Sequence, residues 1–116
     1  MESFEIIRVD LEGFPCLKIK GYFNKETGTA ILPIVDELLG SGKVKILIDF
    51  SECTVLNSPG VSAVLAITMK IVEDFQGKLV LFGLNELKLS VLDFTGVTEL
   101  AQTAKNPADA IQLVKS

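Results

Sequence analysis

The stretch KVKILIDFSECTVLNSPGVSAVL, Lys43 to Leu65, decides the fold class of this chain. Its first eight residues, 43–50, are rich in branched and aromatic side chains and predict a buried strand. The apolar segment that begins at Pro59 predicts a helix that runs to Phe75. A strand followed closely by a helix is the repeating unit of α/β proteins, so this stretch favours a sheet covered by helices.

Further strand patterns lie on both sides of this stretch. The short sequence DLEG separates the first two predicted strands and is typical of a hairpin turn. The strand patterns outside the opening stretch cover 4–9, 14–21 and 78–83, with a further short candidate at 98–103. We therefore expect one α/β domain over residues 1–116, with a mixed sheet of four to five strands and about four helices.

Helical patterns occupy the segments between the predicted strands. They lie within 24–42, 59–75, 85–96 and 106–116, and Gly96 is the expected left-handed end of the third. Pro33 interrupts the first pattern, so that helix either starts near Leu32 or is kinked, because proline lacks the N–H that an interior position needs. In the last pattern Asn106 is the expected N-cap and Pro107 the first helical residue.

The composition narrows the classes of partner. The net charge is -4, and the 11 basic residues are spread along the chain without a run. Nucleic acid and anionic membrane surfaces attract basic patches, so neither is an expected partner. The apolar stretches are too short to span a bilayer, and the acidic N-terminus lacks the layout of a signal peptide. We expect a cytoplasmic protein.

The residues offer little for catalysis. The chain has no histidine, which excludes imidazole-based triads and histidine metal sites, and it has no glycine-rich phosphate loop. Cys16 and Cys53 are far apart in sequence and are expected to be reduced structural thiols. We predict no metal, no cofactor and no enzymatic activity, and a monomer or weak homodimer, since no self-complementary heptad is present.

Ser58 admits two interpretations from its position alone. Serine followed by proline is a preferred helix start, which makes Ser58 the expected N-cap and Pro59 the first helical residue. The same position lies after the carboxyl end of a strand, where α/β proteins commonly present their sites, and a helix N-terminus tolerates a phosphate. The two roles are compatible, and the pattern does not choose between them.

The run from Ile46 to Leu100 resembles the core of a STAS domain of the anti-sigma factor antagonist type. The family has Asp-Leu-Ser at the end of a strand and, a few residues later, Asp-Ser-Ser-Gly at the start of a helix. This sequence has Asp49-Phe50-Ser51 and then Asn57-Ser58-Pro59-Gly60 at those positions. Residues 19–28, IKGYFNKETG, and 92–97, LDFTGV, extend the resemblance over nearly the whole chain.

The resemblance implies regulation of transcription by partner switching. The partner would be an anti-sigma factor that is also a serine kinase; the unmodified protein would bind it, and phosphorylation of Ser58 would break the complex. Gly60 would allow a partner backbone to approach, and Val61 would contact the partner or belong to the core. The expected partner-binding residues are Asn24, Asn57, Ser58, Pro59, Gly60 and Val61.

Three departures from the family pattern support an alternative. Asn24 and Asn57 stand where the family has acids, and Pro59 stands where it has a second serine. The alternative is a STAS module that is not phosphorylated and acts as a constitutive scaffold or as a sensor of a small ligand.

Overall fold

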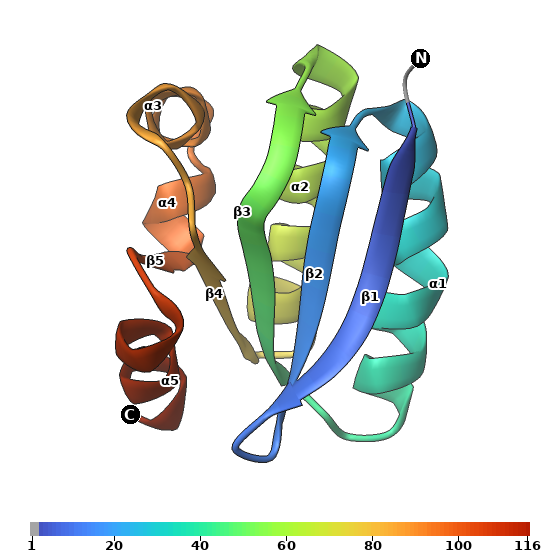
Figure 1. Ribbon diagram of the computed structural model, residues 1–116. Helices are drawn as coiled ribbons and strands as arrows, with labels where there is room; N and C mark the ends of the chain where they lie inside the picture. Colours follow the sequence, from blue (N-terminus) through green and yellow to red (C-terminus); the bar gives the residue numbers. More distant parts are fainter. Residues whose placement is uncertain (1–2) are drawn as a thin grey trace.

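The computed structural model describes residues 3–116 and contains a five-stranded sheet with helices on both faces (Figure 1). The strand order is β1-β2-β3-β4-β5; β1 and β2 are antiparallel, and every later neighbouring pair is parallel. This confirms the predicted α/β class and the mixed sheet. The elements are β1 (Phe4–Leu11), β2 (Phe14–Phe23), α1 (Lys25–Gly40), β3 (Lys45–Leu56), α2 (Ser58–Met69), η1 (Lys70–Asp74), β4 (Lys78–Phe82), α3 (Glu86–Phe94), α4 (Val97–Leu100), β5 (Gln102–Ala104) and α5 (Pro107–Lys115).

A tight hairpin starts the sheet. Glu12 and Gly13 both have positive φ, of 54° and 92°, which is the backbone twist that a two-residue hairpin loop requires. The side chain of Asp10 accepts a hydrogen bond from the N–H of Gly13 at 2.7 Å and fixes the turn. The predicted turn at DLEG is therefore confirmed.

The sheet separates two apolar cores. Helices α1 and α2 cover one face, and α5 covers part of the other (Figure 1). In β3, Ile46 and Ile48 point into the larger core with α1 and α2, whereas Leu47 points into the smaller core with Val114 of α5. This alternation is the period of two that a strand imposes on its side chains.

Helix α1 differs from its prediction at its start. It runs without a break from Lys25 through Pro33 to Gly40, so a start near Leu32 is wrong. Pro33 lies on the exposed face, while Ile31 and Val35 on either side of it are fully buried. Burial of that apolar face stabilises the helix even though Pro33 cannot donate a backbone hydrogen bond.

β3 and α2 also end at residues other than those predicted from the sequence. β3 continues past the predicted end at residue 50 to Leu56, because it stays paired with β2 as far as Phe23. The helix predicted over 59–75 is an α-helix only to Met69 and ends in the π-helical turn η1.

The C-terminal third follows its predicted pattern closely. Gly96 has φ 91° and ends the α3 region in the left-handed conformation, as expected. The candidate strand at 98–103 is confirmed only in its last part, since β5 begins at Gln102 and α4 precedes it. Asn106 caps α5 by accepting a hydrogen bond from the N–H of Asp109 at 2.8 Å, which confirms that prediction.

Candidate functional site

The Ser58 loop lies at the end of the sheet where the carboxyl ends of the parallel strands meet. Phe23 and Leu56 are paired at the carboxyl ends of β2 and β3, and α2 starts two residues after Leu56. The carboxyl ends of parallel strands lie at the same end of the sheet, so the loops after β2, β3 and β4 lie close together there (Figure 1).

Asn57, not Ser58, is the N-cap of α2, and the predicted cap is wrong by one position. The side chain of Asn57 accepts a hydrogen bond from the N–H of Gly60 at 3.0 Å, and the backbone carbonyl of Asn57 accepts one from the N–H of Val61 at 2.9 Å. Asparagine and serine are both strong caps, and proline is tolerated anywhere in the first turn, so the sequence fits either register. The hydroxyl of Ser58 is exposed and is not needed for the cap.

The first turn of α2 has few donors left for an anion. Pro59 has no N–H, and the N–H groups of Gly60 and Val61 are bonded to Asn57. In the described chain, the N–H of Ser58 is the first-turn donor without a partner. An anion on Ser58 therefore meets one backbone donor instead of the several that an open helix end offers.

Gly60 packs against the protein's own backbone. A Cβ at this position would lie 2.0 Å from the carbonyl oxygen of Phe23, so only glycine fits. The N–H of Asn57 donates to the same carbonyl at 3.3 Å. This differs from the expectation that Gly60 admits a partner backbone, since the backbone that it admits is the end of β2.

Asn24 and Val61 lie inside the molecule. Asn24 is 4% exposed and forms a capping box at the start of α1: its side chain accepts from the N–H of Thr27 at 3.1 Å, and the hydroxyl of Thr27 accepts from the N–H of Asn24 at 3.2 Å. Val61 is 6% exposed and belongs to the larger core. The burial of Asn24 differs from the expected contact surface, whereas the burial of Val61 matches the core role that the sequence left open beside partner contact.

Ser58 lines a surface hollow of about 460 Å³. The hollow lies between the start of α2 and the last part of α3. Its walls are formed by Leu56, Asn57, Ser58, Val61, Ser62, Val91 and Thr95. The structure thus places the exposed Ser58 and Pro59 beside a concave surface.

Helix α3 adds exposed apolar side chains that the sequence analysis missed. Phe94 is 93% exposed and Leu87 is 73% exposed, which makes them the most exposed large apolar residues of the described chain. They are seven residues apart and therefore lie on one side of the helix, with Val91 between them. We call Leu87, Val91 and Phe94 the α3 stripe. The spacing of these residues is visible in the sequence, but the same spacing is equally typical of a helix side that packs into the core.

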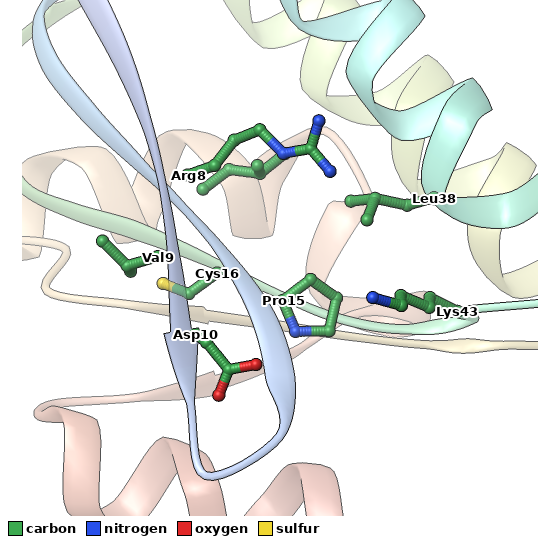
Figure 2. A pocket seen from close by; sticks show the side chains of 8 residues that line it. Arg8, Val9, Asp10, Pro15, Cys16, Leu38 and Lys43 are labelled. Carbon is green, nitrogen blue, oxygen red and sulfur yellow. The ribbon is translucent and has the colours of Figure 1, made fainter. Parts of the chain in front are cut away.

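A second hollow, of about 240 Å³, lies at the opposite end of the sheet, and it contains none of the predicted site residues (Figure 2). Cys16 lines it, but burial, and then the charge of Asp49, raises the pKa of its thiol to about 12. Burial also raises the pKa of Cys53. Both cysteines are free and buried, as predicted, and both remain protonated thiols near neutral pH, which makes them poor nucleophiles.

Residues 3–116 contain no group of three or more Cys, Asp or Glu side chains that could hold a metal ion. Within the same range, no helix has the length and apolar character needed to cross a bilayer.

The chain matches no protein-family model and no curated protein, but its fold matches solved structures. An anti-sigma factor antagonist from Mycobacterium paratuberculosis superposes with a TM-score of 0.84 at 16% identity, over 99% of this chain and 97% of that one. The chain has the fold of the anti-sigma factor antagonists, the STAS fold. The S58E variant of RsbS from Moorella thermoacetica matches with a TM-score of 0.79 at 15% identity, over 95% of this chain and 94% of that one.

A third match is SpoIIAA of Bacillus, a cell fate determinant, in its phosphorylated form. Its TM-score is 0.69 at 20% identity, over 97% of this chain and 99% of that one. These likenesses confirm the fold that the sequence resemblance predicts.

Proposed function

We propose that this protein is an anti-sigma factor antagonist that binds an anti-sigma factor with serine kinase activity and is switched by phosphorylation of Ser58. The observation that carries the proposal is the exposed Ser58 hydroxyl at the start of α2, beside a hollow whose far wall is α3. The STAS fold supports it, and SpoIIAA, which shares that fold, is known in phosphorylated and unphosphorylated forms. This function belongs to the cytoplasm of a bacterium and requires no catalysis by the chain itself.

The docking surface that we propose joins the hollow to the α3 stripe. Leu87 and Phe94 are exposed on one side of α3, and exposed apolar side chains that are grouped in this way are typical of protein interfaces. Ser58 and Pro59 are exposed at the rim, whereas Asn24, Gly60 and Val61 hold the rim in place from inside. A partner seated on the stripe would therefore cover the Ser58 hydroxyl.

The hydrogen bonds of α2 supply a reason for the switch. A phosphate adds about 1.5 to 2 negative charges at pH 7. The first turn of α2 offers that phosphate only the N–H of Ser58, so most of the charge must be solvated by water. A bound partner would exclude that water, and the unpaired charge would then oppose binding.

Phosphorylation can be tested directly by mass spectrometry. The purified protein is incubated with an anti-sigma factor kinase of the same organism and Mg-ATP. We expect one phosphate, on the peptide that contains Ser58. The Ser58→Ala variant should accept none, whereas the matched variant Ser62→Ala, one turn further along the same hollow, should be phosphorylated like the wild type.

A second candidate function is a constitutive scaffold or ligand-sensing module without phosphorylation. Pro59 favours it, since proline fixes the backbone directly after the acceptor, and so does Asn57, whose amide is committed to the cap instead of providing a charge. Kinase binding without any phosphate on Ser58 would favour this candidate and contradict the switch.

A further inference from the structure

The first edge of the sheet is formed by β1, a strand of eight residues. Within residues 3–116 β1 is paired only with β2, so its outer side lacks a strand partner (Figure 1). Edge strands that stay unpaired are commonly protected by bulges, proline or lysine. The sequence of β1, FEIIRVDL, contains no proline and no lysine, and its register with β2 is continuous. This edge is therefore open to another extended chain.

The backbone groups of β1 alternate between β2 and solvent. Leu11 and Phe14 flank the two-residue hairpin loop, and residues in that position form a hydrogen-bonded pair. Hydrogen-bonded and non-hydrogen-bonded pairs alternate along an antiparallel ladder, so the odd-numbered residues of β1 bond to β2. The hydrogen bond from the N–H of Tyr22 to the C=O of Ser3, at 2.9 Å, agrees with this alternation at the other end of the strand. The outward N–H and C=O groups are those of Phe4, Ile6, Arg8 and Asp10.

The side chains at the hairpin end of β1 differ between the two sides of the strand. Figure 2 shows Arg8 and Asp10 on one side of β1 and Val9 on the other. Because side chains alternate along a strand, Ile7 and Leu11 lie on the side of Val9. Val9 is 40% exposed, and Ile7 and Leu11 are half-buried. One side is therefore apolar, and the other carries one charge of each sign.

One antiparallel register makes this segment complementary to a second copy of itself. With Val9 on a two-fold axis, Arg8 of each copy lies opposite Asp10 of the other, and the outward backbone groups of both residues can bond. Ile7 of each copy then lies opposite Leu11 of the other. Directly opposed side chains are about 4.5 to 5.5 Å apart at Cβ, which is close enough for ion pairs and apolar contact. Both sides of the added strand pair are thus matched.

The neighbouring registers lack this match. With Arg8 or Asp10 on the axis, two like charges would lie directly opposite each other, which destabilises a strand pair. With Ile7 on the axis, Arg8 would lie opposite Ile6. Asp10 would then lie opposite Phe4, so both charges would face apolar side chains. The charges therefore select the register that is centred on Val9.

The remaining charges near the axis balance one another. The carboxylate of Glu37 on α1 lies 3.3 Å from the guanidinium of Arg8, and Lys43 lines the same hollow as Arg8. In the hairpin, Glu12 is paired with Lys115 of α5 at 2.9 Å. Acidic and basic groups are thus equal in number around this end of β1. Salt screens the net charge of -4 beyond about 10 Å at about 0.1 M, so that charge opposes the pairing only weakly.

We propose that two copies of this protein pair antiparallel through their β1 edges, with Val9 on the two-fold axis, and form one continuous sheet. A second copy is favoured over a foreign peptide because its own residues 7–11 supply the charges and apolar side chains that match this edge. A two-fold pair is also closed, since it occupies the β1 edge of both copies. β2 and β3 lie between the β1 edge and α3, so binding at the α3 stripe neither needs nor blocks this pairing (Figure 1).

Sedimentation equilibrium tests the pairing through two charge variants. The wild type should show a dimer fraction that rises with concentration up to about 1 mM, as expected for a small interface. Arg8→Glu and Asp10→Lys each place like charges opposite one another and should weaken the dimer at least about tenfold. An equimolar mixture of these two variants should restore the association, because both opposed pairs of the mixed dimer have opposite charges. The matched reversal Glu73→Lys, at an exposed residue of η1, should associate like the wild type.

A cysteine on the axis tests the register without those charge changes. Val9 is paired with Cys16 of β2, so Cys16→Ala is the background in which no disulfide can form across the hairpin. In that background Cys53 is buried, and Val9→Cys should give a disulfide-linked dimer with oxidised glutathione. Ile7→Cys should give at least about tenfold less linked dimer, because Ile7 lies opposite Leu11 and not opposite itself.

Three results would each overturn the proposal. They are a wild type that stays monomeric at about 1 mM, a mixture of Arg8→Glu and Asp10→Lys that associates no better than either variant alone, and equal linkage through Val9→Cys and Ile7→Cys. Asp10 also holds the hairpin turn, so circular dichroism must show that its variant is folded, and the cysteine variants decide if it is not. None of these outcomes depends on phosphorylation of Ser58.

Discussion

At the scale of single residues, the start of α2 shows how closely two neighbouring side chains can compete for one role. Asn57 and Ser58 are both good caps, and only the pairing of β3 with β2 up to Leu56 decides that Asn57 has the extended backbone of a cap, with φ -92° and ψ 176°. The cap therefore depends on a tertiary contact, which a local sequence pattern does not contain.

This assignment separates two alanine variants by their effect on stability. Asn57→Ala removes the acceptor of the Gly60 N–H and should lower the free energy of unfolding by about 0.5 to 2 kcal/mol. Ser58→Ala removes an exposed hydroxyl and should change it by less than about 0.5 kcal/mol. Urea unfolding followed by circular dichroism measures both values. A larger loss of unfolding free energy for Ser58→Ala than for Asn57→Ala would mean that Ser58 is the cap.

Gly60 allows a second test at this scale. Gly60→Ala would place a Cβ 2.0 Å from the carbonyl oxygen of Phe23, so the end of β2 or the start of α2 must move. The free energy of unfolding should fall by about 1 to 3 kcal/mol. Gly40→Ala at the end of α1 is the matched control: a Cβ there meets nothing within 4 Å, and alanine favours helix by up to about 1 kcal/mol. Similar melting temperatures for the two variants would contradict the close packing.

At the scale of elements, the sequence predicted those parts that depend on local pattern. The hairpin, the capped α5 and the left-handed Gly96 need only residues near one another in the chain, and all three are confirmed. The full length of α1 across Pro33 and the extension of β3 to Leu56 depend on burial and strand pairing far along the chain. Those features were missed for that reason.

The candidate site divides in the same way. Ser58 and its loop were recognisable from the motif, but the contribution of α3 was not, because its apolar spacing does not reveal whether the residues face a core or solvent. Leu92 on the same helix is fully buried, whereas Phe94 two residues later is 93% exposed. Only the packing of α3 against α4 and the larger core distinguishes them.

The α3 stripe leads to a prediction about binding without loss of stability. Phe94→Ser and Leu87→Ser each remove an exposed apolar side chain, so the free energy of unfolding should change by less than about 0.5 kcal/mol. If the stripe is the docking surface, affinity for the anti-sigma factor should fall at least about tenfold, or about 1.4 kcal/mol. Val9→Ser, at a side chain 40% exposed on β1 at the other end of the sheet, should leave that affinity unchanged in calorimetry.

At the scale of the whole molecule, the candidate binding surface lies at one end of the sheet and Cys16 lies toward the other. The Ser58 hollow and the α3 stripe lie beyond the carboxyl ends of the parallel strands, whereas Cys16 lines the hollow at the opposite end. The buried cysteines belong to the two different cores, Cys53 to the larger and Cys16 to the smaller. A titration of the Cys16 thiol should therefore alter unfolding without altering the partner surface.

Cys16 makes the stability of the molecule sensitive to alkaline pH. Its pKa is raised from 9.0 to about 12 in the folded protein, mainly by burial, so the folded state holds the thiol proton more tightly than the unfolded state does. The resulting stabilisation is complete below about pH 9 and is lost as the pH rises toward 12, with a slope of up to about 1.4 kcal/mol per pH unit. The measured quantity is the difference in the free energy of unfolding between the wild type and Cys16→Ala, which isolates the contribution of this thiol. Urea unfolding at pH 7, 9, 10 and 11 should show a constant difference up to pH 9 and a shrinking advantage of the wild type above it; a difference that stays constant to pH 11 would mean that the thiol is not buried as described.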